Sequence, residues 1–194
     1  MRRRHELAIG LIILLAIAGV MGQAQSPRSN EADVENRLMS LANRLRLGLS
    51  IASFAVYAPT LGDLHLHAQQ LVNLLEGLEG RHYVRPIEPD DDPRGLVRDV
   101  AELARTFVDQ PLDPTIRIRI GAATKNVGIY LGLALDAALS SLQQRRLDQA
   151  SEEMLRVYAC LAAAYERPCE IPRVPGLWTV LRIFGLAEAS PDET

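Results

Sequence analysis

With 194 residues, the chain is long enough for one domain with its own hydrophobic core, and its 48% hydrophobic and 23% charged residues exclude a disordered polypeptide. Aromatic residues make up only 5% of the sequence, so most of the apolar surface comes from small and aliphatic side chains. This composition favours close-packed helices over a β-sandwich. The formal net charge of −3 argues against a nucleic-acid partner, because nucleic-acid binding needs a basic face.

The first 24 residues have the three zones of a secretory signal. Three arginines come first, an apolar run from Leu7 to Val20 follows, and small residues lead to Ala24. We predict a cleaved signal peptide over residues 1–24. Because the apolar run is shorter than the roughly 20 residues that span a membrane, an uncleaved membrane anchor is the alternative.

Either outcome places the body of the chain outside the cytoplasm. We expect an exported bacterial protein in the periplasm, at the cell surface or outside the cell, with membrane contact only through the N-terminal segment if it is uncleaved. Removal of residues 1–24 takes away three Arg and one Glu, so the net charge changes from −3 to −5. This acidic body has no general attraction to anionic lipids.

Apolar residues at spacings of three and four predict two long amphipathic helices after a polar, flexible linker at 25–32. The first helix covers residues 31–58, and the second covers residues 60–79. Arg37, Arg44 and Arg46 fall outside the apolar stripe of the first helix, as expected for an amphipathic helix.

A long irregular segment follows the second helix. It contains three prolines and an acidic run from Glu88 to Asp92. Long loops on compact domains often carry function, so this segment is a place to look for a site.

Two further helices are predicted at 93–109 and 114–143, each opened by an aspartate followed by a proline. Isoleucines alternate with arginines over 116–120, which taken alone favours a strand. The helical periodicity continues beyond this stretch, so we predict a helix there. A short strand pairing with residues 83–87 is the alternative.

Three glycines, Gly121, Gly128 and Gly132, share one face of this fourth helix and would let another backbone pack tightly against it; a cleft where a ligand approaches the backbone is the alternative. A fifth helix starts at Asp148, and a short apolar helix is predicted over 177–186. We expect the short helix to dock on the bundle as a lid. If it were exposed, it would be a binding patch for a partner or a membrane surface.

Together these elements predict an all-α fold, an up-and-down bundle of four to five helices with a short C-terminal helix, preceded by the signal sequence. We assign residues 33–188 to the helical bundle domain. Residues 189–194 are predicted to form a disordered tail.

The main candidates for a binding site are His65 and His67 in the second helix, His82 and Tyr83 just beyond it, and Trp178 in the short C-terminal helix. Histidine is a common ligand of metals and haem, and bundle cores hold such sites. Residues two apart point to opposite sides of a helix, so His65 and His67 cannot share one ion from the same helix. We expect histidines at the core boundary with their hydrogen bonds satisfied, and metal or haem binding is the alternative.

The acidic run offers oxygen ligands, of which Asp90 and Asp92 are the candidates for a divalent cation. The run lacks the Asp-x-Asp-x-Asp-Gly spacing of an EF-hand, so a solvated acidic loop is the simpler interpretation. No Cys-x-x-Cys-His motif is present, so any haem would be bound non-covalently.

Two cysteines, Cys160 and Cys169, agree with export, because an oxidising compartment lets such a pair stay bridged. The chain would have to fold back until the two Cα atoms are about 5.5 Å apart. We predict this disulfide, and two free buried thiols are the alternative.

Motifs for a nucleophilic serine or a phosphate-binding loop are absent from the sequence, so no catalytic residue is assigned. We expect a non-enzymatic exported helical bundle that acts as an interaction, sensory or small-ligand binding module. Its partner would be an unknown protein or small ligand, and no cofactor is expected. The alternative is a metal- or haem-binding four-helix bundle that uses His65, His67 or His82. A hydrolase without a recognisable motif is a third hypothesis.

Overall fold

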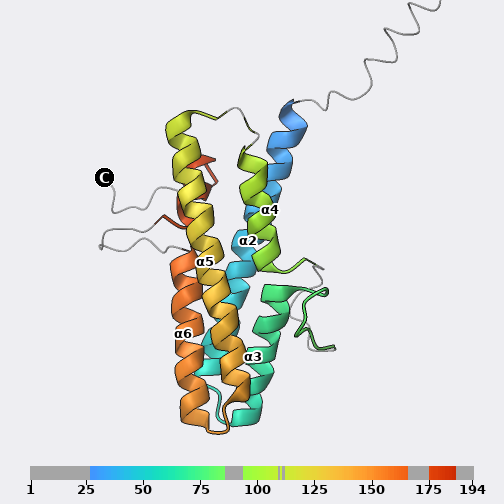
Figure 1. The fold of residues 1–194 in the computed structure, drawn as a ribbon, viewed down its shortest axis with the longest axis vertical. Coiled ribbons are helices and arrows are strands. Elements are labelled where there is room, and N and C mark those ends of the chain that lie inside the picture. Colours follow the sequence, from blue (N-terminus) through green and yellow to red (C-terminus); the bar gives the residue numbers. More distant parts are fainter. Residues whose placement is uncertain (1–26, 86–93, 109, 111, 166–174, 187–194) are drawn as a thin grey trace, which may run out of the picture. The chain divides into compact units, whose positions relative to one another are not determined.

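The structure, a computed structural model, describes residues 27–85, 94–108, 110, 112–165 and 175–186. These residues form six helices and no strand (Figure 1). The predicted all-α fold is therefore confirmed for the described residues. The helices are α2 (Pro27–Val56), α3 (Leu61–Glu76), α4 (Leu96–Val108), α5 (Pro114–Gln143), α6 (Leu147–Tyr165) and α7 (Leu177–Ile183).

The alternative of a strand at 116–120 is wrong, because these residues lie in the first turns of α5. The side chain of Asp113 caps that helix by accepting hydrogen bonds from the amides of Thr115 and Ile116. Thr60 caps α3 in the same way and accepts from the amide of Asp63 at 3.1 Å. Each cap satisfies amides that have no partner inside the helix, so the local sequence sets the helix start.

α2 begins at Pro27, so its first turns overlap residues 25–32, where the sequence predicts a linker. Proline is tolerated in a first helical turn because the amide there has no intrahelical acceptor. The chain divides into two compact units between Val34 and Glu35, and the packing below concerns the second unit. The predicted signal peptide and C-terminal tail lie outside the described residues.

α5 is the central helix of the second unit, because α3, α4, α6 and α7 all pack against it. A short turn joins α5 to α6, and the two helices run side by side in opposite directions (Figure 1). The apolar stripes predicted for α3, α5 and α6 are buried in the structure. Their buried members are Leu64, Ala68, Leu71, Leu75, Val127, Leu131, Ala134, Ala138, Ala150, Met154, Val157, Leu161 and Ala164.

α7 docks on the bundle, as the sequence predicts for this segment. Val180 and Leu181 are buried, and the ring of Phe184 lies 5.4 Å from that of Phe107 between their centroids. The side-chain amide of Asn126 on α5 donates to the carbonyl oxygen of Pro175 at 3.0 Å and fixes the chain just before α7. In the described part of the chain, no helix is long and apolar enough to cross a membrane.

The tight internal packing predicted for the glycines of α5 is wrong. Among the described residues, a Cβ atom added at Gly121 or Gly132 would meet no other atom within 4 Å, and one added at Gly128 would only reach Val100 at 4.0 Å. The reason is that these glycines lie away from the buried stripe of α5. At Gly48 of α2, by contrast, an added Cβ would lie 3.3 Å from a side-chain carbon of Leu74.

The start of α4 lies against the end of α3, and Gly95 makes this contact. Its φ is +39°, a conformation that L side chains rarely adopt, and an added Cβ would overlap the backbone of Glu76 and Gly77. The segment between the two helices is also tied to α3, because the side chain of Asn73 pairs with both the amide and the carbonyl of Val84, at 3.1 and 2.8 Å. These contacts fix the point at which α4 begins.

We predict that Gly95→Ala lowers the free energy of unfolding by about 2 kcal/mol, because it combines an unfavourable φ with a backbone overlap. Urea unfolding followed by circular dichroism would measure the change. The matched control is Gly62→Ala in the first turn of α3, where the added Cβ would lie 3.8 Å from the nearest atom and should cost no stability. Equal stability of both variants would contradict this account.

Candidate functional site

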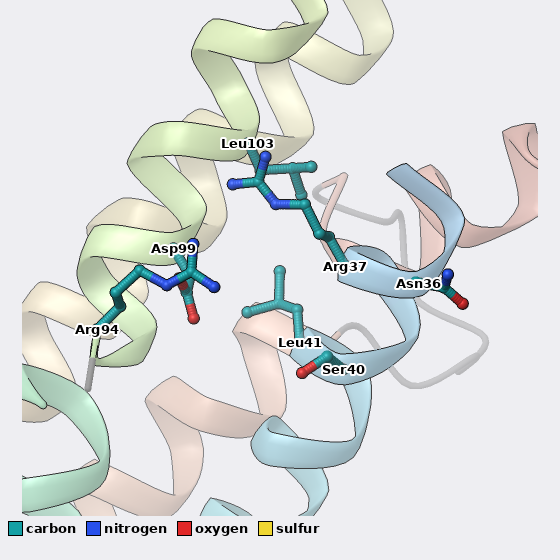
Figure 2. Close-up of a pocket in the computed structure, with 7 residues that line it drawn as sticks. All are labelled: Asn36, Arg37, Ser40, Leu41, Arg94, Asp99 and Leu103. Atoms are coloured by element: carbon teal, nitrogen blue, oxygen red, sulfur yellow. The ribbon is translucent and has the colours of Figure 1, made fainter. Parts of the chain in front are cut away.

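A pocket of about 190 Å³ lies between α2 and the start of α4 (Figure 2). It has room for about six water molecules at roughly 30 Å³ each, which suits a small organic molecule. The lining residues are Asn36, Arg37, Ser40, Leu41, Arg94, Asp99 and Leu103. None of these residues is among the candidate site residues predicted from the sequence.

Helical spacing explains why these side chains meet. Arg37, Ser40, Leu41 and Arg44 are three, four and seven residues apart and therefore share one side of α2. Asp99 lies in the first turn of α4, where the positive end of the helix dipole favours a carboxylate.

Arg44 and Asp99 form the ion pair that joins the two helices at the pocket. Their side chains are only 8% and 17% exposed, so both charges are largely withdrawn from water. A charge-assisted hydrogen bond in such surroundings is much stronger than one at the surface, whereas either charge alone would be costly to bury. The pair therefore holds α2 and α4 in a fixed register beside the pocket.

The contacts around this pair are longer. Arg37 lies 3.6 Å from Glu102, and Arg94 lies 3.6 Å from Asp99 and 3.7 Å from Glu102, measured between nitrogen and oxygen atoms. These separations exceed the usual 2.7–3.2 Å of a hydrogen bond, and Nη1 of Arg37 also lies 3.5 Å from the hydroxyl oxygen of Thr106. The exposed fractions of Arg37 and Arg94, 27% and 47%, show that both can be reached from solvent.

The charge balance at the pocket is positive. Four guanidinium groups, of Arg37, Arg44, Arg94 and Arg98, lie beside the two carboxylates of Asp99 and Glu102, and Arg98 also pairs with Glu79. Figure 2 shows Arg37 and Arg94 entering the space between the helices from opposite sides, while Asn36 points away. Guanidinium groups match planar oxyanions such as carboxylates, so this arrangement favours recognition of a small anion.

The two histidines of α3 lie apart from this pocket and point in different directions. His67 contacts Gln70 through Nδ1 at 2.9 Å, and its ring lies 6.1 Å from that of Phe54. His65 is half-buried, and its Nε2 has no hydrogen-bond partner among the described residues, so the expectation of satisfied hydrogen bonds is wrong for this nitrogen. The two side chains have different surroundings, as expected for positions two apart on a helix.

His82 belongs to the connection that is tied to the end of α3. Its Nδ1 lies 2.7 Å from a carboxylate oxygen of Glu76, and its backbone amide donates to the other oxygen of the same carboxylate, also at 2.7 Å. Tyr83 is half-buried beside it, and its amide donates to the carbonyl oxygen of Gly80 at 3.3 Å. The contacts of His82 therefore hold the connection to α3.

The described residues contain no group of three or more His, Cys, Asp or Glu side chains arranged to hold a metal ion. Asp90 and Asp92 lie outside the described residues. Binding of a metal or haem through His65, His67 or His82 stays a prediction.

Trp178 is half-buried on α7, with its ring 6.2 Å from that of Tyr165. Cys160 is half-buried on α6, and its surroundings raise the pKa of the thiol by desolvation. Cys169 lies outside the described residues, so the disulfide stays a prediction.

The spacing of charged residues in the sequence indicates the helix contact beside this pocket, although no ligand-binding motif does. Arg37 and Arg44 are seven residues apart at the edge of one apolar stripe, and Asp99 and Glu102 are three residues apart on another helix. Opposite charges with helical spacing indicate two helices that pair through these residues. Which helices would pair depends on tertiary packing, so the pocket itself could not be predicted.

Comparison with known proteins gives no relative: no family model, curated protein or solved structure matches the chain.

We predict that Asp99→Ala lowers the free energy of unfolding by about 3 kcal/mol, because it leaves Arg44 buried without this carboxylate. Thermal and urea unfolding would measure the loss. The matched control is Asp148→Ala, which removes the 2.6 Å contact with Arg146 at the surface, where side chains of the pair are 61% and 69% exposed. Its effect should be far smaller, and equal losses would show that the Arg44–Asp99 pair has no special role.

Proposed function

We propose that this protein is an exported, non-enzymatic binding module whose ligand is a small organic carboxylate held in the pocket between α2 and α4. The observation that carries the proposal is the pair of accessible guanidinium groups, Arg37 and Arg94, at a small pocket anchored by a buried ion pair. Among the functions expected from the sequence, these arginines favour small-ligand binding over a general interaction module.

The chemistry of the lining supports a carboxylate of modest size. Arg37 and Arg94 supply paired donors for the carboxylate oxygens, and the hydroxyl of Ser40 supplies a further polar group. Leu41 and Leu103 supply apolar surface for the carbon skeleton. In ligand pockets, polar groups of this kind fix the orientation of the ligand, while the apolar surface holds its carbon atoms.

The proposed function also includes the export and the bundle topology that the sequence predicts. A signal at residues 1–24 would export the chain, and the helices would form an up-and-down bundle with the short α7 docked on it. A bundle of this kind would present the pocket outside the cytoplasm.

We predict that acetate, lactate or succinate binds the exported protein and that Arg94→Gln weakens the binding at least about tenfold, since a charge-assisted pair is lost. Isothermal titration calorimetry would measure the affinities, and Arg37→Gln should behave similarly. The matched control is Arg81→Gln, an exposed arginine in the connection after α3, which should bind like the unmodified protein.

Two outcomes would contradict the proposed function. One is the absence of binding by all three carboxylates at millimolar concentration, and the other is equal binding by Arg94→Gln and the unmodified protein. Absorbance between about 350 and 450 nm, together with elemental analysis, tests the metal or haem alternative separately, because haem and several metals absorb there. A bound chromophore or metal lost on His65→Ala would favour that alternative.

A further inference from the structure

From Ile120 onward one side of α5 is buried, and the opposite, exposed side carries apolar residues; the helix before Ile120 is exposed on all sides. Ile118 is 72% exposed, and Ile129 and Leu133 are each 50% exposed. At about 100° per residue these side chains lie on the same side of α5, opposite the buried stripe. An exposed apolar face of this length indicates an interaction surface.

The glycines on this face have no packing role in the described chain. An added Cβ at Gly121 or Gly132 would meet nothing within 4 Å. Glycine lowers the stability of an exposed helix, so alanine would be the better residue if solvent were the only neighbour. Glycine on an apolar face does allow a second helix to come close.

The charges on this face are self-complementary. Between Ile120 and Gln143 the only charged residues of α5 are Lys125 and Asp136, and neither forms an ion pair with any described residue. They lie eleven residues apart, or about 16 Å along the helix at roughly 1.5 Å per residue. Both lie on the side of α5 that carries Ile118 and Ile129, so they face the same partner.

We propose that this face binds a second copy of the same chain, with the two α5 helices antiparallel about a two-fold axis level with Tyr130 and Leu131. In that arrangement Lys125 of each copy lies at the level of Asp136 of the other, and both ion pairs form at once. Ile129 lies at the level of Gly132 of the second copy, where the missing side chain leaves room for it. A two-fold contact uses the same patch on both copies, which is what one basic and one acidic residue on a single face provide.

A groove beside this face widens the contact. It has a volume of about 470 Å³, lies between α5 and α6, and includes Leu133 and Asp136. Ala159 and Arg156 line its other side from α6. The face and the groove are continuous, so apolar side chains of the second copy have a recess next to the ion pairs. This surface is separate from the pocket between α2 and α4, and the proposal does not depend on the proposed function.

Charge reversal tests the proposal. Analytical ultracentrifugation of the protein purified from the exported fraction should show a dimer at about 100 µM, the range in which a contact of modest affinity is populated. Lys125→Asp and Asp136→Lys should each weaken the dimer at least about tenfold, because like charges then face each other. The double variant K125D/D136K should restore the dimer, because the charges are again opposite.

Two further variants make the result unambiguous. Ile129→Glu should give a monomer with an unchanged helical circular dichroism spectrum, since it places a charge in the apolar centre. Arg81→Glu, a charge reversal away from α5, should leave the dimer unchanged. A monomer in the unmodified protein, or a dimer that both single reversals leave intact, would overturn the proposal.

Discussion

Arg44 and Asp99 meet where α2 passes the start of α4, and both side chains are largely withdrawn from solvent. Two buried charges of opposite sign fix the register of two helices more strictly than apolar contacts, because a shift of either helix leaves a charge without its partner. The pocket depends on this register. Arg37 lies on the same side of α2 as Arg44, and Arg94 lies just before α4, so both guanidinium groups are placed at the opening by the same contact.

Much of the fold follows from local rules that operate within the sequence. The caps at Thr60 and Asp113 are set by side chains next to the amides they satisfy, and the apolar stripe of α6 from Ala150 to Ala164 follows from helical periodicity alone. The glycines of α5 show the limit of such rules. Their shared face was visible in the sequence, but whether that face turns inward or outward is decided by which other helices cover α5.

The candidate site was harder to predict because it forms between distant parts of the chain. Arg37 and Asp99 are separated by more than sixty residues, and only the packing of α2 on α4 brings them together. The histidines were candidate ligands because of their residue type, yet Nδ1 of His82 contacts the carboxylate of Glu76 at the end of α3. Residue type indicates which chemistry is available, whereas the pocket requires a particular geometry.

The central claim is that the pocket between α2 and α4 holds a small carboxylate. Native mass spectrometry of the protein purified from its exported compartment, compared with the denatured chain, tests it most directly. We predict a small anionic adduct that is lost in the Arg94→Gln variant and retained in Arg81→Gln. A native mass equal to that of the bare chain or to a whole multiple of it, or an adduct that Arg94→Gln retains, would contradict the claim.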